Sequence, residues 1–418
     1  MPFEDFTPFI PATFVTAKDG RGYVATVLVK ATLAMRHDAF AEPLDDQLFP
    51  QGDVYTDDAQ PAESSLHYAS DFTPTKPRGE VVLVGAAHRP ADRPEGDFTA
   101  ALHVGALSKE LVVSGRREFE HGVFSSKIIE QEPLAAVPLT FENAFGGPKT
   151  ASNPVGRGDG SNELPLVEHP SRRLGRPGDK PEPSSFAPIA PSWEPRKSMI
   201  GTYRHDYAAK HWPGFPTDFN PAYFNAAPID QQIDGYWRGD EEIILENIHS
   251  DHAHFRTKLP GWRVVCVRED FRDAAELIPL AIDTLQIDAD AGNVVVLWRG
   301  ETKIQSPDAP EIKHFGFLVQ SLAAEIRDVA YYQRQLQEFI DQRDAEYEPK
   351  SPPEPSPAIG VETNPGTAAP SAAESAEPDP LLAQLQGEIA AVRSKAGHPE
   401  ESPPPQSVEL PPLAPEAR

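Results

Sequence analysis

Three histidines close together in the sequence are the densest group of metal ligands in this chain. His249, His252 and His254 fall within one short segment, and an extended backbone places the last two on one face. A catalytic zinc site takes three protein ligands and keeps an open position. The sequence has no His-Glu-x-x-His pattern and no paired cysteines, so a polar loop ahead of a strand is the alternative interpretation.

A pair of carboxylates is a second source of hydrolytic chemistry. Glu142 together with Asp159, Glu163, Asp206 or Asp218 offers the two carboxyl groups that a glycosidase uses. The sequence gives no distance between these groups, and acidic residues are frequent in this chain. The alternative interpretation is that these carboxylates are ordinary polar residues.

A run of alternating glycines suggests a third kind of site. Gly156, Gly158 and Gly160 are interleaved with other residues, and Arg157 lies between the first two. Backbone N–H groups in such a run can bind an anion. No strand leads directly into the run and no helix pattern follows it, which removes the context of a dinucleotide-binding loop. The sequence therefore points to no cofactor.

Most of these residues belong to a tract, about 140–240, in which Gly and Pro alternate with aromatic residues. Linkers are rich in Gly and Pro but poor in aromatics, so the tract predicts an ordered surface with tight turns rather than a tether. Its aromatic side chains either pack it onto the sheets or serve as recognition anchors. They are Phe141, Phe145, Trp193, Tyr203, Trp212, Phe215, Phe219, Tyr223 and Phe224.

Alternating hydrophobicity on both sides of the tract predicts β-strands. Residues 22–35 alternate between an apolar face and a face that carries Thr26, Lys30 and Thr32, which is typical of a half-buried strand. The fold class is therefore mainly β, or α+β overall, with antiparallel sheets. Further predicted strands lie at 80–86, 107–113 and 262–268, with a hairpin formed by 280–287 and 294–298.

The end of the chain changes in character. Apolar residues three and four apart predict an amphipathic helix over 317–343. Residues 349–418 hold 16 of the 46 prolines and no aromatic residue, which predicts a disordered, acidic tail. A weaker helical pattern at 381–395 is either a segment that folds on a partner or a fluctuating helix without one. The predicted organisation is a β-rich domain at 1–310, a C-terminal helix at 311–348, and the tail.

Charge and cysteine content limit the partners and the compartment. A formal net charge of −26 argues against nucleic acid and anionic membranes, and it is compatible with a basic protein partner. The single cysteine, Cys266, excludes a disulfide within the chain. The N-terminus lacks a signal-peptide pattern, and no apolar run is long enough to span a bilayer. These features predict a cytoplasmic protein.

Motifs spread over about 10–305 resemble the bacterial family called domain of unknown function 2169, which is encoded near type VI secretion genes. The matching segments are 27–32, 68–77, 139–147, 153–158, 201–203, 224–228, 259–261, 283–288 and 296–300. Asn143 departs from the family, which usually has a basic residue there. The residues predicted as signature positions or partner surface are Glu142, Phe145, Gly146, Gly147, Asn153, Pro154, Gly156, Arg157, Gly158, Tyr203, Phe224 and Asn225.

The resemblance implies a non-enzymatic adaptor or chaperone that binds a secreted effector protein and helps load it onto the secretion spike. The family has no established catalytic residues, so the resemblance carries none over to this chain. Two other classes stay open at this point. One is a metal- or carboxylate-dependent hydrolase that uses His249, His252, His254 or Glu142, and the other is a structural component of the secretion apparatus.

Overall fold

The computed structural model describes residues 1–346 except 18–21, 124, 208–210, 213 and 273. Residues Met1–Glu348 form one compact unit. The predicted tail and its helix at 381–395 lie outside the described residues. No helix in the described ranges is long and apolar enough to cross a membrane.

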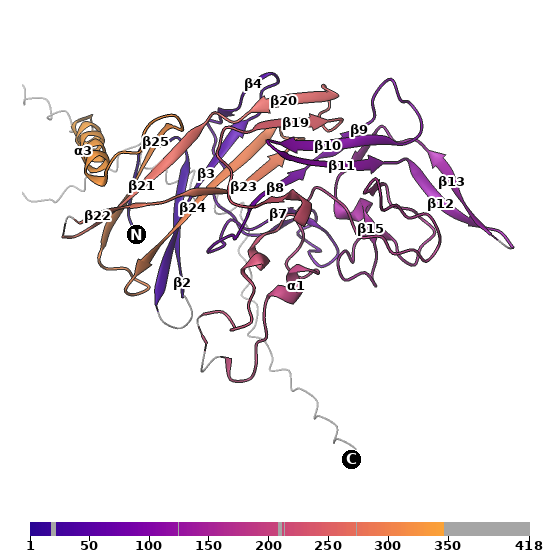
Figure 1. Cartoon of the computed structure of the whole chain (residues 1–418), viewed down its shortest axis with the longest axis horizontal. Coiled ribbons are helices and arrows are strands. Elements are labelled where there is room, and N and C mark those ends of the chain that lie inside the picture. Colours follow the sequence, from indigo (N-terminus) through magenta and orange to yellow (C-terminus); the bar gives the residue numbers. More distant parts are fainter. Residues whose placement is uncertain (18–21, 124, 208–210, 213, 273, 347–418) are drawn as a thin grey trace, which may run out of the picture. The chain divides into compact units, whose positions relative to one another are not determined.

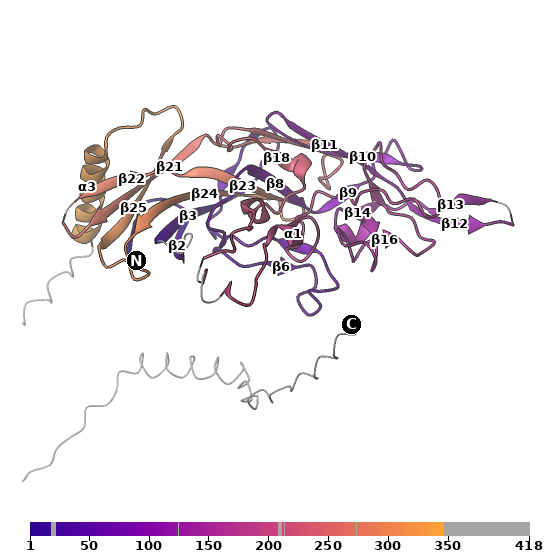
Figure 2. The same ribbon diagram turned by 60° about the horizontal axis from the view of Figure 1, so that its bottom comes forward.

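A mixed sheet of seven strands forms the centre of this unit (Figures 1 and 2). Its order is β18-β8-β23-β24-β3-β2, with β5 paired to β3. The predicted hairpin is confirmed, because β23 and β24 pair antiparallel, whereas β8 and β23 pair parallel. The bounds are β2 (Ile10–Ala17), β3 (Tyr23–Ala34), β5 (Glu42–Pro43), β8 (Gly79–Val84), β18 (Gln232–Ile233), β23 (Ala281–Asp288) and β24 (Asn293–Ile304).

Two further sheets share one hydrophobic core with the central sheet. Val27 of β3, Leu102 of β10 and Phe317 of β25 are fully buried members of this core. The first sheet has the order β17-β11-β10-β19-β20-β4 and the second has the order β1-β25-β21-β22. The bounds are β1 (Phe3–Asp5), β4 (Ala39–Phe40), β10 (Phe98–Val104), β11 (Leu107–Val113), β17 (Val167–Glu168), β19 (Glu242–Glu246), β20 (His254–Lys258), β21 (Trp262–Asp270), β22 (Ala275–Ile278) and β25 (Ile312–Ser321).

Smaller elements lie at the periphery of the sheets. A hairpin of β12 (Arg116–His121) and β13 (Ser126–Glu132) projects from one end of the unit, and helix α3 (Val329–Glu346) covers the other end (Figures 1 and 2). The remaining short strands outside the tract are β6 (Val54–Tyr55), β7 (Leu66–Tyr68), β9 (Ala86–His88) and β14 (Ala136–Pro138).

The tract at 140–240 is largely irregular, as its composition predicts. Among its described residues, the α-helix α1 (Arg196–Met199) has four residues. The other elements in it, besides β17 and β18, are η1 (Phe141–Asn143), β15 (Phe145–Gly146), β16 (Arg157–Gly158), η2 (Pro221–Phe224) and η3 (Ile229–Gln231).

The strand predicted at 22–35 exists as β3, but it is buried on both faces rather than on one. Thr26 and Thr32 are fully buried and Lys30 is 2% exposed. The face that carries them is covered by other chain segments: the Thr26 hydroxyl donates to the carbonyl of Pro74, and the Lys30 ammonium donates to the carbonyl of Phe49. The polar face of β3 that the sequence shows is therefore buried inside the protein.

The helix predicted at 317–343 is wrong in its first part. Residues 312–321 form β25, which pairs with β21, and the helix α3 begins at Val329. The apolar residues of 315–319 satisfy a two-residue period as well as a helical one, and pairing with β21 selects the strand. Tyr332 and Leu336 of α3 then pack on Leu318.

Candidate functional site

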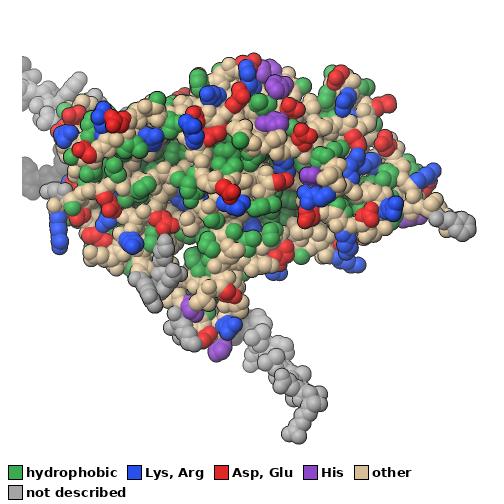
Figure 3. Space-filling model, in the orientation of Figure 1, with side chains coloured by type: hydrophobic (Ala, Val, Ile, Leu, Met, Phe, Trp, Pro, Cys, Tyr) green, Lys and Arg blue, Asp and Glu red, His purple; other side chains and the backbone are tan. Residues whose placement is uncertain are grey.

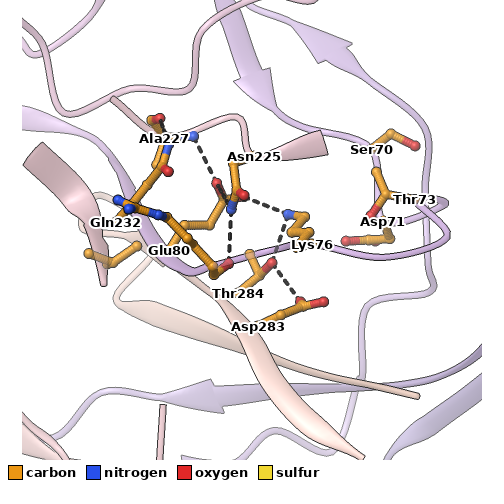
Figure 4. A network of polar contacts seen from close by, with 12 residues as sticks. Ser70, Asp71, Thr73, Lys76, Glu80, Asn225, Ala227, Gln232, Asp283 and Thr284 are labelled. Atoms are coloured by element: carbon orange, nitrogen blue, oxygen red, sulfur yellow. Dashed lines mark hydrogen bonds and ion pairs between the residues drawn. The ribbon is translucent and has the colours of Figure 1, made fainter. Parts of the chain in front are cut away.

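Five of the sequence motifs meet in one buried network between the central sheet and the segments that cover it (Figure 4). Six charged side chains of this network, five from the motifs together with Glu80, form what we call the polar layer. Its members are Lys30, Asp71, Lys76, Glu80, Asp283 and Arg299. All six residues are buried, and they come from β3, β8, β23, β24 and the segment between β7 and β8.

The charges of the polar layer are paired one to one. Lys30 Nζ lies 2.8 Å from Asp71 Oδ2, and Lys76 Nζ lies 2.5 Å from Glu80 Oε1. Arg299 Nε lies 2.6 Å from Asp283 Oδ2. Three cations therefore face three anions, which keeps the buried layer electrically neutral.

Hydrogen bonds link these pairs to one another and to the backbone. Arg299 Nη1 donates to the carbonyls of Asp71 and Thr73 at 2.8 and 2.6 Å. The Thr284 hydroxyl accepts from Lys76 at 2.7 Å and donates to Asp283 at 2.9 Å. The three ion pairs are thus parts of one connected network rather than separate contacts.

The tract is attached to the sheet through the same layer. Glu80 Oε2 accepts hydrogen bonds from Asn225 Nδ2 at 3.1 Å and from the backbone N–H of Ala227 at 3.0 Å. Asn225 Nδ2 also donates to the carbonyl of Arg78. Asn225, a predicted signature residue, therefore has a structural task in holding the end of the tract on β8.

We predict that Asp283→Asn lowers the free energy of unfolding by about 3–5 kcal/mol, because it leaves the Arg299 guanidinium buried without a counter-charge. Urea denaturation measures the change. The matched control is Asp234→Asn, which removes a carboxylate whose side chain is 90% exposed and pairs with Arg78. We expect the control to cost less than about 1 kcal/mol. Equal losses in the two variants would contradict this account of the polar layer.

Nine of the predicted signature residues come together in a second structure, the Asn153 turn, which comprises residues 141–147 and 153–158. Short parallel strands β15 and β16 pair within it. Asn153 is fully buried, and its Nδ2 donates to the carbonyls of Phe141 and Phe145 at 2.7 and 2.9 Å. Arg157 Nε donates to the carbonyl of Glu142 at 3.0 Å. The members predicted from sequence are Glu142, Phe145, Gly146, Gly147, Asn153, Pro154, Gly156, Arg157 and Gly158.

The glycines of the Asn153 turn are required for two different reasons. Gly147 and Gly158 have φ of 149° and 102°, a conformation that L side chains rarely adopt. Gly146 and Gly156 instead lack room for a side chain. A Cβ at Gly146 would lie 2.2 Å from the carbonyl oxygen of Asn153, and one at Gly156 would lie 2.3 Å from Asn153 Nδ2.

We predict that Gly156→Ala destabilises the protein by about 1–3 kcal/mol, because the added Cβ must displace Asn153 or the nearby backbone. The control is Gly52→Ala, where a Cβ meets no atom within 4 Å. Thermal unfolding of both variants provides the comparison. If Gly156→Ala melts at the same temperature as the control, the close approach of Asn153 is not what requires glycine here.

Glu142 connects the Asn153 turn to the segment before β7. Its carboxylate accepts from the backbone N–H and the hydroxyl of Ser65, both at 2.7 Å, and from the Thr56 hydroxyl at 3.1 Å. Burial alone raises the pKa of Glu142, but hydrogen bonds from Thr140 and Ser65 outweigh it, so the pKa lies below the ordinary value. This carboxylate therefore stays ionised and acts as a hydrogen-bond acceptor for two chain segments.

We predict that Glu142→Gln loses about 1–3 kcal/mol of stability at pH 7, the range expected for hydrogen bonds to a charged group. Because the folded pKa is lowered, the stabilisation is complete above the ordinary pKa of 4.5 and disappears as the pH falls through the folded value. Denaturant titrations of both proteins at pH 7 and in acid test this. A difference that does not shrink in acid would contradict the assignment.

The aromatic candidates divide between the interior and the surface. Phe145 and Phe224 are buried, at 3% and 8% exposure, so they pack the tract onto the unit. Tyr203 is 51% exposed and its ring contacts Tyr207, while Trp212 is 71% exposed. Tyr203 is thus the one predicted signature residue on the described surface that presents a large aromatic side chain.

The histidines considered as metal ligands lie near the outer edge formed by β4 and β20, where Figure 3 shows histidine side chains gathered. The rings of His249 and His252 are 5.1 Å apart, and His252 also stacks on His37 at 4.0 Å. His254 instead approaches Glu246 at 3.8 Å. Within the described ranges, no three or more His, Cys, Asp or Glu residues are grouped so as to hold a metal ion.

A polar cavity of about 630 Å³ lies between the β12–β13 hairpin and the Asn153 turn. Arg117 and Arg157 line it, and both have carboxylate partners: Arg117 Nη2 lies 2.6 Å from Glu168, and Arg157 Nη1 lies 3.6 Å from Glu163. Asn143 also lines the cavity and donates to the carbonyl of Pro138. Arg117 and Arg157 thus each have a carboxylate partner within the chain, and Arg116 lines the cavity as well.

Sequence reasoning missed most of the polar layer. Lys30, Asp71, Lys76, Asp283 and Arg299 lie within the family-like motifs, but none was a predicted site residue. One signal was present in the sequence: these motifs carry charges of both signs inside or beside apolar strands. A charged residue in such a strand needs a partner. Another motif supplies it for Lys30 and for Arg299.

Comparison with known proteins identifies the family. The family described as "Uncharacterized protein conserved in bacteria (DUF2169)" matches residues 19–299, so the chain belongs to it. No curated protein and no solved structure matches the chain. The matched range includes the polar layer and the Asn153 turn.

Proposed function

We propose that this protein is a non-enzymatic adaptor that binds a type VI secretion effector and helps load it onto the secretion spike. The proposal rests on one observation: most of the motif residues bind other parts of the same chain. The charged side chains of the polar layer neutralise one another inside the unit, and Glu142 and Asn153 bind neighbouring backbone. Such residues fix the shape of the surface, and a partner would be recognised by the side chains exposed on it.

The exposed side chains of the tract and its neighbours suit a protein partner. Several large apolar residues stand on the described surface, and aromatic side chains of this kind are frequent anchors in protein interfaces. They are Phe72, Tyr203, Trp212, Ile229 and Tyr236, with exposures of 46%, 51%, 71%, 71% and 46%. The net charge of −26 favours a partner with a basic surface.

The naming of the partner as an effector rests on the family's association with type VI secretion genes. The proposal therefore predicts that the tagged protein, co-expressed with the effector encoded beside it, forms a stable complex that survives gel filtration. We expect less soluble effector when the adaptor is deleted. The adaptor should be absent from purified, assembled spikes, whereas a structural component would be present in them.

Tyr203→Ser and Trp212→Ser variants test whether the exposed aromatic side chains contribute to the complex. The control is Phe49→Ser, which removes a side chain that is 74% exposed and lies outside the tract. Loss of effector binding in the first two variants but not in the control supports the proposal. Failure of the wild-type protein to bind any effector of its gene cluster would overturn it.

A further inference from the structure

The central sheet ends in a long edge strand, β2, and its pairing with β3 fixes which of its backbone groups face outward. The register pairs Ile10 with Lys30 and continues without a bulge to Ala17 with Tyr23. On β3, the N–H and C=O of Thr32 point to this side of the strand, because they bond to the Gln47 side chain. Backbone direction alternates along a strand, so Lys30, Leu28, Thr26 and Val24 point toward β2.

The β2 residues that pair with those four β3 residues therefore use their backbone N–H and C=O groups to bond to β3. The backbone groups of the other β2 residues point away from the sheet. The outward residues are Pro11, Thr13, Val15 and Ala17. Pro11 has no N–H, and because it lies on the outward side no hydrogen bond between β2 and β3 is lost. Within the described chain, no backbone hydrogen bond reaches the outward groups of these four residues.

Other sheet edges are protected in ways that β2 is not. The terminal strands β1, β4, β17, β18 and β22 have two to four residues each. The longer edge strand β13 carries Lys127, Glu130 and Glu132. Short length, charge and proline are among the means by which proteins prevent pairing at an edge, and on β2 Pro11 blocks only the first outward position. β2 has eight residues and none of them is charged.

An apolar groove continues from the end of this strand. Thr16 and Ala17 of β2 form part of its wall, and Phe215 and Phe219 of the tract form another part. Its volume is about 240 Å³, and among the described residues that line it Glu301 alone is ionisable. Phe14, on the same face of β2 as Thr16, packs edge-to-face on the exposed ring of Phe72.

We propose that the outward edge of β2 binds an extended segment of a protein partner by β-strand addition, and that the groove beside it takes an apolar or proline side chain of that segment. Backbone hydrogen bonds to Thr13, Val15 and Ala17 give the segment its register. The groove then selects among extended sequences. The inference rests on the proposed adaptor function, because it assumes that the partner is a protein.

Charge favours a different protein over a second copy of this chain as the occupant. Two copies would each bring a net charge of −26, and β2 has no charged residue that could offset the repulsion. The same net charge favours a segment whose apolar residues are flanked by Lys or Arg. The expected ligand is therefore an extended, apolar segment with basic flanks.

The test uses the full chain and a phage-displayed library of ten-residue peptides with alternating apolar positions and basic flanks. Thr13→Pro removes an outward N–H without removing a bond to β3, and Thr13→Val is the matched control that keeps it. We expect selected peptides to bind the wild type and Thr13→Val equally and to bind Thr13→Pro at least about tenfold more weakly. Equal melting temperatures for the two variants are the folding control.

Hydrogen exchange gives a second readout that needs no substitution. Binding of a selected peptide to the wild type should slow exchange at the amides of Thr13, Val15 and Ala17. Peptides that bind Thr13→Pro as tightly as the wild type, or protection confined to other amides, would overturn the proposal. So would failure to select any peptide, or a homodimer of the wild type that Thr13→Pro dissociates.

These outcomes are separable from the test of the adaptor function. If the effector binds the wild type and Thr13→Pro equally, the adaptor function stands and the β2 edge is not its binding site. If selected peptides bind and protect the β2 amides while no effector forms a complex, the edge binds extended peptides and the adaptor function fails.

Discussion

The structure depends on the neutrality of the polar layer, which is buried beneath the segment between β7 and β8 and the end of the tract. One face of the central sheet carries Lys30, Glu80, Asp283 and Arg299, and such a face cannot be closed by apolar packing alone. The segment that covers it brings Asp71 and Lys76, which complete two of the three ion pairs, while Asp283 and Arg299 pair within the sheet. A buried charge without a partner costs several kcal/mol, so Lys30 and Glu80 require the covering segment to be in place. Arg299 is linked to the same segment through the carbonyls of Asp71 and Thr73. The ion pairs thus fix the irregular segment between β7 and β8 on the sheet without any pairing between strands.

This arrangement explains why one half of the architecture could be predicted from sequence and the other half could not. Strands such as 107–113 and the hairpin after residue 280 follow from two-residue alternation, which is a local signal. The polar layer joins residues far apart in the chain, such as Lys30 with Asp71, and its partners are set by tertiary structure. Lys30 alone reads as a solvent-facing residue. The start of α3 was missed because 315–319 fits two periodicities, and only pairing with β21 decides between them.

The predicted signature residues turn out to serve the shape of the molecule. Asn153 and the glycines around it form a turn in which two backbones approach too closely for a side chain, and Glu142 fastens that turn to the segment before β7. Tyr203 differs from them because it is exposed. A family motif can thus indicate a rigid framework, while recognition lies in neighbouring residues that the framework holds at the surface. This arrangement is compatible with the proposed adaptor function.

The pairing of β3 with β24 has a consequence for how the protein is made. Tyr23 pairs with Ile304 and Ala34 with Asn293, so the centre of the largest sheet joins an early segment to a late one. β1 likewise pairs with β25. Contacts between such distant segments form slowly because a long loop must close first. During synthesis, β2 and β3 emerge from the ribosome long before β24 exists. The nascent chain therefore holds an uncovered apolar hairpin for most of translation, and general chaperones would be expected to meet it there.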